Sequence, residues 1–254
     1  MRAASLAALL LSASGAAGIE QAERRSGIEF ASPETQAMQA DDTANPGMFW
    51  VLDGAELWRK REGAAGKSCA DCHQDAAKSM RGVAARYPDF DAQSGRPVDL
   101  SGRINLCRAN HQQAAPLGHE SPQMLALTAF VANQSRGMPV TPAADPRLAN
   151  NLAEGRRLFE QRMGQLDLSC ANCHDDHWNA RLGGSAVTQA QPNAYPLYRL
   201  EWQSLGSLQR RMRACMVGVR AEPFDYGAPE FVDLELYLMS RATGLKMETP
   251  GVRP

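Results

Sequence analysis

The chain has 254 residues, enough for one large domain or for two small ones. Hydrophobic residues make up 44% of the sequence, as in an ordinary globular protein, so the composition excludes a chain that is disordered throughout. The formal net charge is −1, which lacks the strongly basic balance of a nucleic-acid-binding domain. We therefore expect a folded protein that does not bind nucleic acid.

The first residues are typical of a secretory signal peptide. Arg2 is followed by a short apolar stretch over residues 3–11 and then by small residues over 12–17, where cleavage would occur. This stretch is too short to span a bilayer, which needs about 20 apolar residues, and no other run is long enough. We expect a signal peptide over 1–17, export to the periplasm and no membrane span. A buried N-terminal helix is the alternative.

Four of the six cysteines lie in two Cys-x-x-Cys-His motifs, at 69–73 and 170–174, although cysteines in an exported chain first suggest disulfides. This spacing is the attachment signature of c-type haem: two thiols reach the vinyl groups on one porphyrin edge, and the next imidazole points at the iron. A zinc site or a redox motif would need no histidine after both pairs. We expect two covalent haems attached at Cys69, Cys72, Cys170 and Cys173, with proximal ligands His73 and His174.

The second half of the chain repeats the first. At an offset of 101 residues, Gly54 and Trp58 before the first motif correspond to Gly155 and Phe159 before the second. After the motifs the offset becomes 108, and it pairs Tyr87 with Tyr195, Arg103 with Arg211, and Cys107 with Cys215. A colinear register of this kind indicates two homologous domains.

We therefore predict a mainly α protein made of two tandem cytochrome c-like domains. The expected bounds are an N-terminal extension at 18–47, a first domain at 48–139, a linker at 140–146 and a second domain at 147–254. The extension is polar, and it is either an ordered arm or a disordered leader.

Each expected domain has a helix before its haem motif and a helix at its C-terminal end. In the first domain the closing helix starts at Ser121-Pro122, as N-cap and first helical residue, and stops by Gly137. In the second domain it opens at Pro229 and stops by Gly244. Little of the sequence is typical of strand.

Each iron needs a second axial ligand unless its site is open, and Met and His are the common choices. Met138 is a conventional candidate for the first iron, but its repeat partner is Leu245, so the repeat does not support it. His177 is only three residues from His174, too close to reach across the haem ring.

Cys107 and Cys215 are the two cysteines left over, and they occupy equivalent positions in the repeat. They are distal thiolate ligands, or one disulfide between the domains, or inert buried thiols. Equivalent positions favour ligation, one thiolate for each haem. Thiolate donation would stabilise ferric iron and lower the reduction potential, which argues against a plain electron carrier and favours chemistry at a cysteine sulfur.

Arg211 precedes Cys215 by one helical turn. Apolar residues from Leu205 to Val219 recur at helical spacing, which predicts a helix with Cys215 on its buried side and Arg211 on the same side. A guanidinium on a face that meets haem should hold an anion or a haem propionate. Arg103 stands in the same relation to Cys107.

At this point the sequence resembles the SoxA family, the haem subunits of the SoxAX cytochromes in bacterial thiosulfate oxidation. The resemblance covers roughly residues 45–247 and is most specific in the second domain. It rests there on Ser169 to His174, Tyr195 to Arg199, Glu201-Trp202, Arg211, Cys215 and Glu235 to Leu238. The first motif, with Cys107, resembles the dihaem branch of the family.

The resemblance implies an L-cysteine S-thiosulfotransferase, in which thiosulfate is joined oxidatively to a cysteine of a SoxYZ-like carrier protein. It implies that Cys215 ligates the active-site haem and carries a persulfide, with Arg211 beside it, and that both residues are catalytic. Electrons would leave through a SoxX-like monohaem cytochrome in a heterodimer. The alternatives are a tetrathionate-forming thiosulfate dehydrogenase and a dihaem electron-relay subunit without catalysis of its own.

Overall fold

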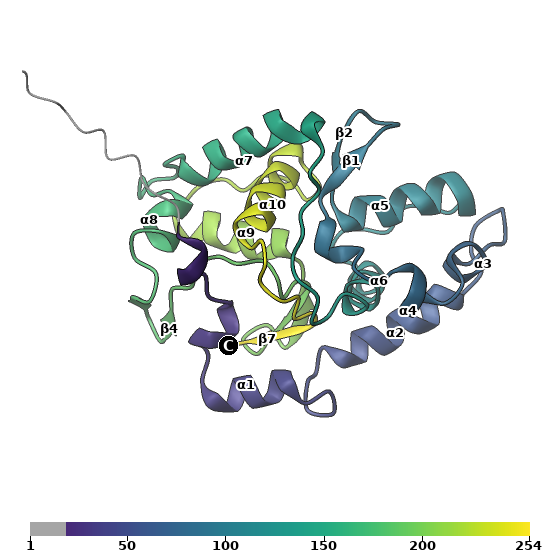
Figure 1. The fold of residues 1–254 in the computed structure, drawn as a ribbon, viewed down its shortest axis with the longest axis horizontal. Helices are drawn as coiled ribbons and strands as arrows, with labels where there is room; N and C mark the ends of the chain where they lie inside the picture. Colours follow the sequence, from purple (N-terminus) through teal and green to yellow (C-terminus); the bar gives the residue numbers. More distant parts are fainter. Residues whose placement is uncertain (1–18) are drawn as a thin grey trace, which may run out of the picture.

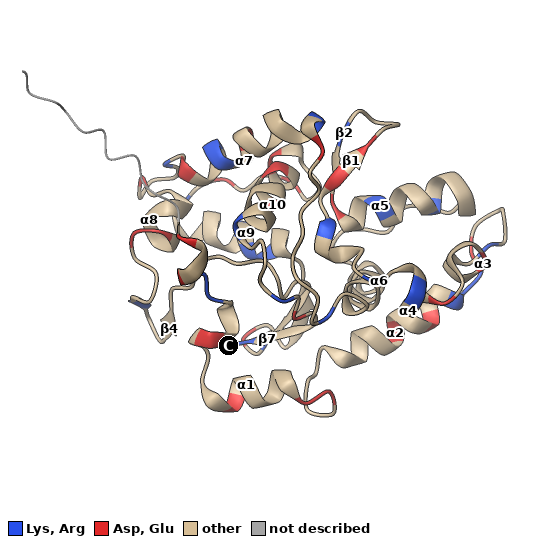
Figure 2. Cartoon of the chain, in the orientation of Figure 1, with Lys and Arg blue, Asp and Glu red and all other residues tan. Residues whose placement is uncertain are grey.

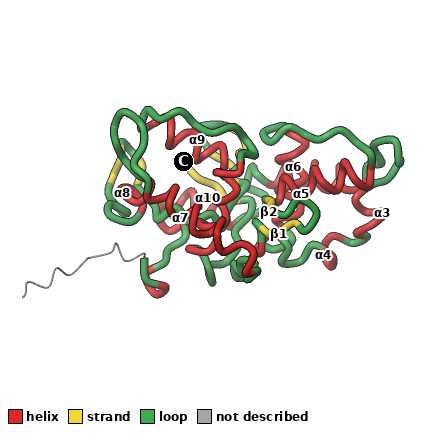
Figure 3. The backbone as a smooth tube through the Cα atoms, turned by 90° about the horizontal axis from the view of Figure 1, so that it is seen from above, coloured by secondary structure: helices red, strands yellow, loops and turns green. Residues whose placement is uncertain are grey.

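The structure, a computed structural model, describes residues 19–254, so the expected signal peptide at 1–17 lies outside the described residues. Figure 1 shows two groups of helices side by side, and the view from above in Figure 3 separates them again. Acidic and basic residues are interspersed over both groups (Figure 2). Within residues 19–254, no helix combines the length and the apolar character needed to cross a membrane.

The first group is built around two crossing helices, α2 and α6. Its elements are α2 (Met48–Arg59), α3 (Cys69–His73), α4 (Ala76–Ser79), η3 (Ala84–Arg86), β1 (Asp89–Asp91), β2 (Arg96–Val98), α5 (Leu100–Cys107), the π-helical turn η4 (Arg108–Gln112) and α6 (Pro122–Asn133). The helices approach so closely that a Cβ atom at Gly54 would overlap the carbonyl oxygen of Ala126. Only glycine fits this crossing.

The second group repeats this arrangement with α7 and α10. Its elements are η5 (Pro146–Leu148), α7 (Ala149–Glu160), α8 (Cys170–His174), β3 (Arg181–Leu182), β4 (Ser185–Ala186), β5 (Leu197–Arg199), β6 (Ser204–Gly206), α9 (Leu208–Gly218), α10 (Pro229–Arg241) and β7 (Gly251–Arg253). A Cβ atom at Gly155 would overlap the carbonyl oxygen of Asp233. The glycine repeated in the sequence thus marks the same helix crossing in both groups.

A short hairpin leads into the helix that carries the leftover cysteine in each domain. The β1–β2 hairpin pairs Asp91 with Arg96, and the β5–β6 hairpin pairs Arg199 with Ser204, in the same register. The following helices, α5 and α9, are capped by Asp99 and Ser207 respectively. These strands have three residues each, too few for an alternating pattern to reveal them in the sequence.

The two closing helices confirm the sequence prediction at their N-termini. α6 begins at Pro122, and the Ser121 hydroxyl accepts a hydrogen bond from the Met124 amide at 3.2 Å. α10 begins at Pro229. The helix expected from Leu205 is wrong at its start, because Leu205 lies in β6 and the Ser207 side chain caps the helix two residues later.

The N-terminal extension is an ordered arm along the second domain, with η1 (Gln21–Glu23), η2 (Gly27–Phe30) and α1 (Pro33–Ala40). Figure 1 shows α1 below β7, which pairs in parallel with β5. The Val252 amide donates to Gln39 Oε1 at 2.9 Å, and Asn45 Nδ2 donates to the Pro250 carbonyl at 2.9 Å. Of the two readings of the extension, the ordered arm is therefore right.

Apolar residues join the two domains. Ala84, Ala132 and Val140 from the first half pack with Met239 and Met247 from the second. Val140 is fully buried, and its amide donates to the Leu245 carbonyl at 2.8 Å. The segment expected as a linker therefore begins with a core residue, and it runs without helix or strand from 141 to the start of η5.

Candidate functional site

Each Cys-x-x-Cys-His motif forms a single helical turn fixed by the residue before it. The Ser68 hydroxyl accepts a hydrogen bond from the Asp71 amide at 3.1 Å, and the Ser169 hydroxyl accepts one from Asn172 at 3.2 Å. In both motifs the third helical side chain reaches back to the serine amide, which completes a capping box. All six cysteines lie in the described part of the chain, and none of them is in a disulfide there.

His174 is oriented as a metal ligand would be. Its Nδ1 lies 2.5 Å from the Thr188 carbonyl oxygen, to which it donates a hydrogen bond when it carries the proton. That bond fixes the tautomer and leaves Nε2 free as a ligand. His73 is held differently, with its ring 5.7 Å from that of Trp58, centroid to centroid.

Cys215 lies beside His174 of the second motif, close enough for the two side chains to interact. Burial acts to raise the pKa of the Cys215 thiol, but a hydrogen bond with His174 and the charges of Arg211 and Arg199 outweigh it, so the pKa is lowered. Burial, together with the charge of Cys215, raises the pKa of Cys170 in the motif to about 12. The structure thus brings both motif and leftover cysteine to one place.

Cys107 takes the equivalent place beside the first motif. Burial raises the pKa of its thiol, against the charge of Arg103 and with that of Cys72. Met138, the conventional alternative, has its terminal methyl 3.1 Å from the position a Cβ would take on Gly82. The two leftover cysteines therefore differ in charge environment: the pKa is raised at Cys107 and lowered at Cys215.

Arg211 is half-buried, and its guanidinium donates no hydrogen bond to any residue between 19 and 254. Burial acts to lower its pKa, but the Cys215 sulfur, Tyr195 and Glu201 outweigh it, and the pKa is raised. Because this half-buried guanidinium has no partner among the described residues, its donors are available to an anionic ligand.

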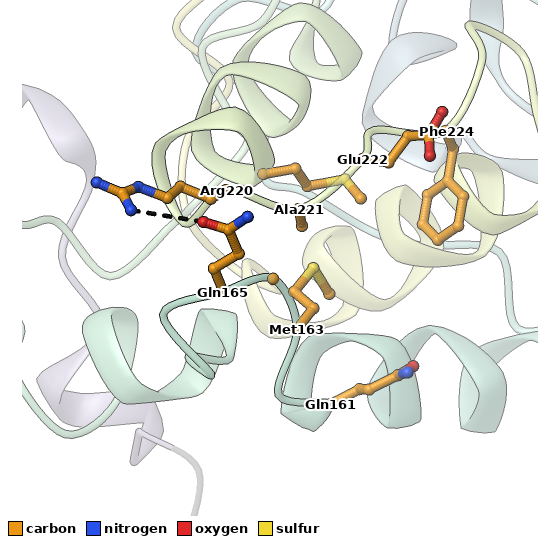
Figure 4. A pocket seen from close by; sticks show the side chains of 9 residues that line it. Gln161, Met163, Gln165, Arg220, Ala221, Glu222 and Phe224 are labelled. Carbon is orange, nitrogen blue, oxygen red and sulfur yellow. Dashed lines mark hydrogen bonds between the residues drawn. The ribbon is translucent and has the colours of Figure 1, made fainter.

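A pocket of about 460 Å³ opens beside the second motif, between the loop after α7 and the C-terminal end of α9. Figure 4 shows Met163 and Phe224 on its walls and the hydrogen bond, 3.4 Å long, between Arg220 and Gln165 at its rim. Its apolar walls belong to the cluster that also packs Cys170. Cys215 and Arg211 do not line this pocket.

The residues of the second domain fit a covalent haem. They supply two thiols on one helical turn, an imidazole with a free Nε2, a facing sulfur and an apolar wall. This donor set matches the Cys-x-x-Cys-His attachment chemistry. Bound haem would supply one-electron redox capacity at its iron.

Comparison with known proteins decides the family. The model of the SoxA/TsdA cytochrome c domain matches residues 53–140 and 154–247. The chain belongs to this family. Two matched stretches in tandem confirm the mainly α fold of two cytochrome c domains, a family whose cofactor is haem c.

Curated SoxA proteins match most of the chain. The L-cysteine S-thiosulfotransferase subunit SoxA of Rhodovulum sulfidophilum is 40% identical over 231 residues, which are 91% of this chain and 80% of the relative. The SoxA of Paracoccus pantotrophus is 35% identical over 228 residues, 90% and 78% of the two chains. The crystal structure of SoxXA from P. pantotrophus matches with a TM-score of 0.87 and 34% identity, covering 91% of this chain and 87% of that one.

One residue of the site, Arg199, is not predicted from the sequence to have a function. Arg199 at the end of β5 belongs to the stretch that resembles SoxA, but nothing in its local pattern assigns it a function. In the structure its charge acts on Cys215 together with that of Arg211. Comparison of the two halves at the offset of 108 would have pointed to it, since position 91 is an aspartate.

Proposed function

We propose that this chain is the dihaem SoxA-type subunit of an exported L-cysteine S-thiosulfotransferase. The observation that carries the proposal is the Cys215 sulfur beside His174 of the second motif, with Arg211 one helical turn away and its guanidinium without a hydrogen-bond partner among residues 19–254. The SoxA relatives and the SoxXA structure support it. We propose a SoxX-like monohaem cytochrome as partner in a heterodimer, and the periplasm as the compartment.

The proposed reaction joins thiosulfate to a cysteine thiol of a SoxYZ-like carrier protein. The carrier sulfur forms a bond to the outer sulfur of thiosulfate, which gives a protein-bound S-thiosulfonate. The thiol loses one proton and the pair of reactants loses two electrons. The partner cytochrome is the oxidant and accepts these electrons one at a time.

Within this reaction Arg211 binds the substrate. Its fork of N–H donors matches the oxygen atoms of the sulfonate end of thiosulfate, and low exposure strengthens the charge-assisted hydrogen bonds. Cys215 lies close enough to Arg211 for their charges to interact, so a sulfonate held by the arginine brings the outer sulfur toward the Cys215 sulfur. Cys215, as thiolate or persulfide, is then the centre at which thiosulfate is activated.

The site assignment for the haems is part of the proposal. Cys170 and Cys173 would hold the active-site haem covalently, and His174 and Cys215 would bind its iron. Cys69 and Cys72 would hold the other haem, and His73 and Cys107 would bind its iron. The domains are proposed to extend over 48–139 and 147–254.

Turnover with and without the carrier tests the function. The holo-heterodimer is supplied with thiosulfate, an electron acceptor and a purified SoxYZ-like carrier. We expect thiosulfate-dependent electron transfer that requires the carrier and leaves a mass increase on one carrier cysteine. Equal rates without carrier, with tetrathionate as product, would instead identify a thiosulfate dehydrogenase, and no turnover in either case would identify an electron-relay subunit.

A further inference from the structure

In each domain a hairpin leads into the helix that contains the leftover cysteine, and the two hairpins have the same pairing register. Single positions can therefore be compared between the domains. In the first domain Asp91 ends β1 and pairs with Arg96 of β2; in the second, Arg199 ends β5 and pairs with Ser204 of β6. The helices that follow carry Arg103 and Arg211 at equivalent positions. Position 91 therefore corresponds to position 199.

In the first domain this arginine is neutralised. Arg103 Nη2 lies 2.9 Å from Asp91 Oδ1, and the aspartate side chain is only 7% exposed. The Nε of Arg103 also donates to the Tyr87 hydroxyl at 3.2 Å. The guanidinium beside Cys107 thus has an anion of its own and offers little to a ligand.

In the second domain the aspartate is replaced by a second arginine. The Arg199 side chain is only 11% exposed. Its Nε lies 3.0 Å from an oxygen of Glu201, which is half-exposed, but the contact lacks hydrogen-bond geometry and Nε has no acceptor among residues 19–254. Asp91 and Arg103 are in direct contact, so we expect Arg199 and Arg211, at the equivalent positions, to be neighbours. Burial lowers the pKa of Arg199, and the charge of Arg211 lowers it further.

Two partly desolvated cations side by side are unfavourable unless an anion joins them. The surroundings supply little negative charge, because Glu201 points partly to water and Tyr195 is a phenol. The charges of both arginines lower the pKa of the Cys215 thiol, which belongs to the proposed reaction centre. One domain therefore has a closed ion pair, and the other has an open pair of cations, at the same place in the fold.

We propose that Arg199 is a second substrate-binding residue, which forms with Arg211 a two-guanidinium site for a small, doubly charged sulfur oxoanion beside Cys215. The inference rests on the proposed function and names the residue that sets its selectivity. Two cations match the two negative charges of thiosulfate, and a singly charged anion satisfies only one of them. In the first domain Asp91 already neutralises Arg103, so the anion is expected to bind only in the second domain.

The experiment compares Arg199→Ala, Arg199→Lys and Arg199→Asp in the holo-heterodimer with the carrier present. Arg210→Ala is the matched control: Arg199 and Arg210 both lie over the Trp202 ring, 5.2 Å and 4.2 Å from its centroid, so this variant removes a positive charge and a contact with Trp202 from the neighbouring helix α9. We expect Arg199→Ala to raise the KM for thiosulfate about 10- to 100-fold, as for loss of a charge-assisted hydrogen bond, with a smaller change in kcat. Arg199→Lys should restore part of the affinity.

Arg199→Asp rebuilds the ion pair of the first domain. Because the new carboxylate would occupy Arg211, we expect it to lower kcat/KM more than Arg199→Ala does, and the visible and electron paramagnetic resonance spectra to stay unchanged. Calorimetric titration of each oxidised complex with sulfate gives binding without turnover. Sulfate should bind the wild type and the Arg210→Ala control alike, and Arg199→Ala at least tenfold more weakly, within the range of about 10- to 100-fold.

Unchanged KM and unchanged sulfate affinity in Arg199→Ala would overturn the inference. A shifted reduction potential or haem loss with unchanged anion affinity would also overturn it, since Arg199 would then hold a haem propionate. If the wild type fails to turn over thiosulfate, the proposed function fails, and the sulfate titration still decides the role of Arg199.

Discussion

The sulfur of Cys215 in α9 lies beside the imidazole of His174 in α8, whose Nδ1 is 2.5 Å from the Thr188 carbonyl oxygen. The second haem-attachment motif thus has a sulfur next to the imidazole whose Nδ1 is already held by the backbone. Cys107 has the equivalent position in the first domain, close to the charge of Cys72. The pair of geometries leads to a prediction about both irons.

Each leftover cysteine should be the distal ligand of one haem. Cys215→Ala should change the low-spin ferric signal of one haem in electron paramagnetic resonance and abolish turnover. Cys107→Ala should change the other signal and leave more activity, since catalysis is assigned to the second domain. Met138→Ala is the control, and a first-haem signal that responds to it and not to Cys107→Ala would contradict this ligand set.

Arg211 should contribute mainly to turnover. Arg211→Ala should lower the rate about 10²- to 10³-fold, as for removal of one preorganised donor, and barely change the haem spectrum. Arg211→Lys should restore only part of the rate, because lysine has a point charge and no planar fork. Arg181→Ala, on an exposed strand, controls for loss of a positive charge. A native rate in Arg211→Ala would show that the arginine is a propionate anchor or a surface charge.

The glycines at the two helix crossings should be required for stability. Gly54→Ala and Gly155→Ala each place a methyl group on a backbone carbonyl, which cannot move aside as a flexible side chain can. Overpacking costs about 1–3 kcal/mol, and a rigid obstacle favours the upper end. The gain in helix propensity is about 1 kcal/mol, so the net effect is a loss.

Unfolding of the holo-protein in guanidinium chloride, followed by circular dichroism, measures this loss of stability. Gly184→Ala is the control, because nothing lies within 4 Å of a Cβ there and its φ is ordinary. Equal midpoints for the crossing variants and the control would show that the helices can separate without cost.

Two carboxyl groups meet between the domains and should make stability depend on pH. Burial and then the charge of Asp99 raise the pKa of Glu235 well above its ordinary value, against a hydrogen bond from Gln209. Burial also raises the pKa of Asp99, against its bond from the Gly102 amide and the charge of His119. Gln209 Nε2 donates to Asp99 Oδ2 at 3.0 Å, which ties α9 to the N-terminus of α5.

A raised folded-state pKa favours the protonated carboxyl in the folded protein. Its stabilising effect is complete below the unfolded pKa, about 4.3 for Glu, and is lost as the pH rises through the folded-state value. Glu235→Gln should therefore flatten the fall in melting temperature of the holo-protein at higher pH. Glu56→Gln, on an exposed part of α2, is the control and should not change that fall. If Glu235→Gln also left the fall unchanged, the Glu235 carboxyl would be ionised in the folded state and the prediction would be wrong.

The haem motifs, the repeat and the closing helices could be predicted from the sequence because each depends on nearby residues. Pro122 and Pro229 open helices for reasons that a few neighbouring residues contain. The start of α9 was misplaced because Leu205 continues its apolar period from within a strand. That strand, β6, pairs with β5, and β5 is in turn paired with β7 near the C-terminus, a partner that local sequence does not reveal.

The role of Arg199 could not be predicted from local sequence patterns either. Arg211 is twelve positions further along the chain, and only the β5–β6 hairpin and the start of α9 bring the two positions to the same side of the domain. The contrast with Asp91 becomes informative only when the strand register shows the two positions to be equivalent. The ordered arm was likewise open, because its partners Val252 and Pro250 lie at the other end of the chain.

The intact mass of the holo-protein under denaturing conditions tests the central claim most directly. The chain is produced in a host competent for c-type maturation, so that both motifs can be loaded. The account predicts the mass of the mature polypeptide plus two covalent haems, with any persulfide on Cys215 visible as one extra sulfur. A single haem, or none, on the mature chain would contradict it.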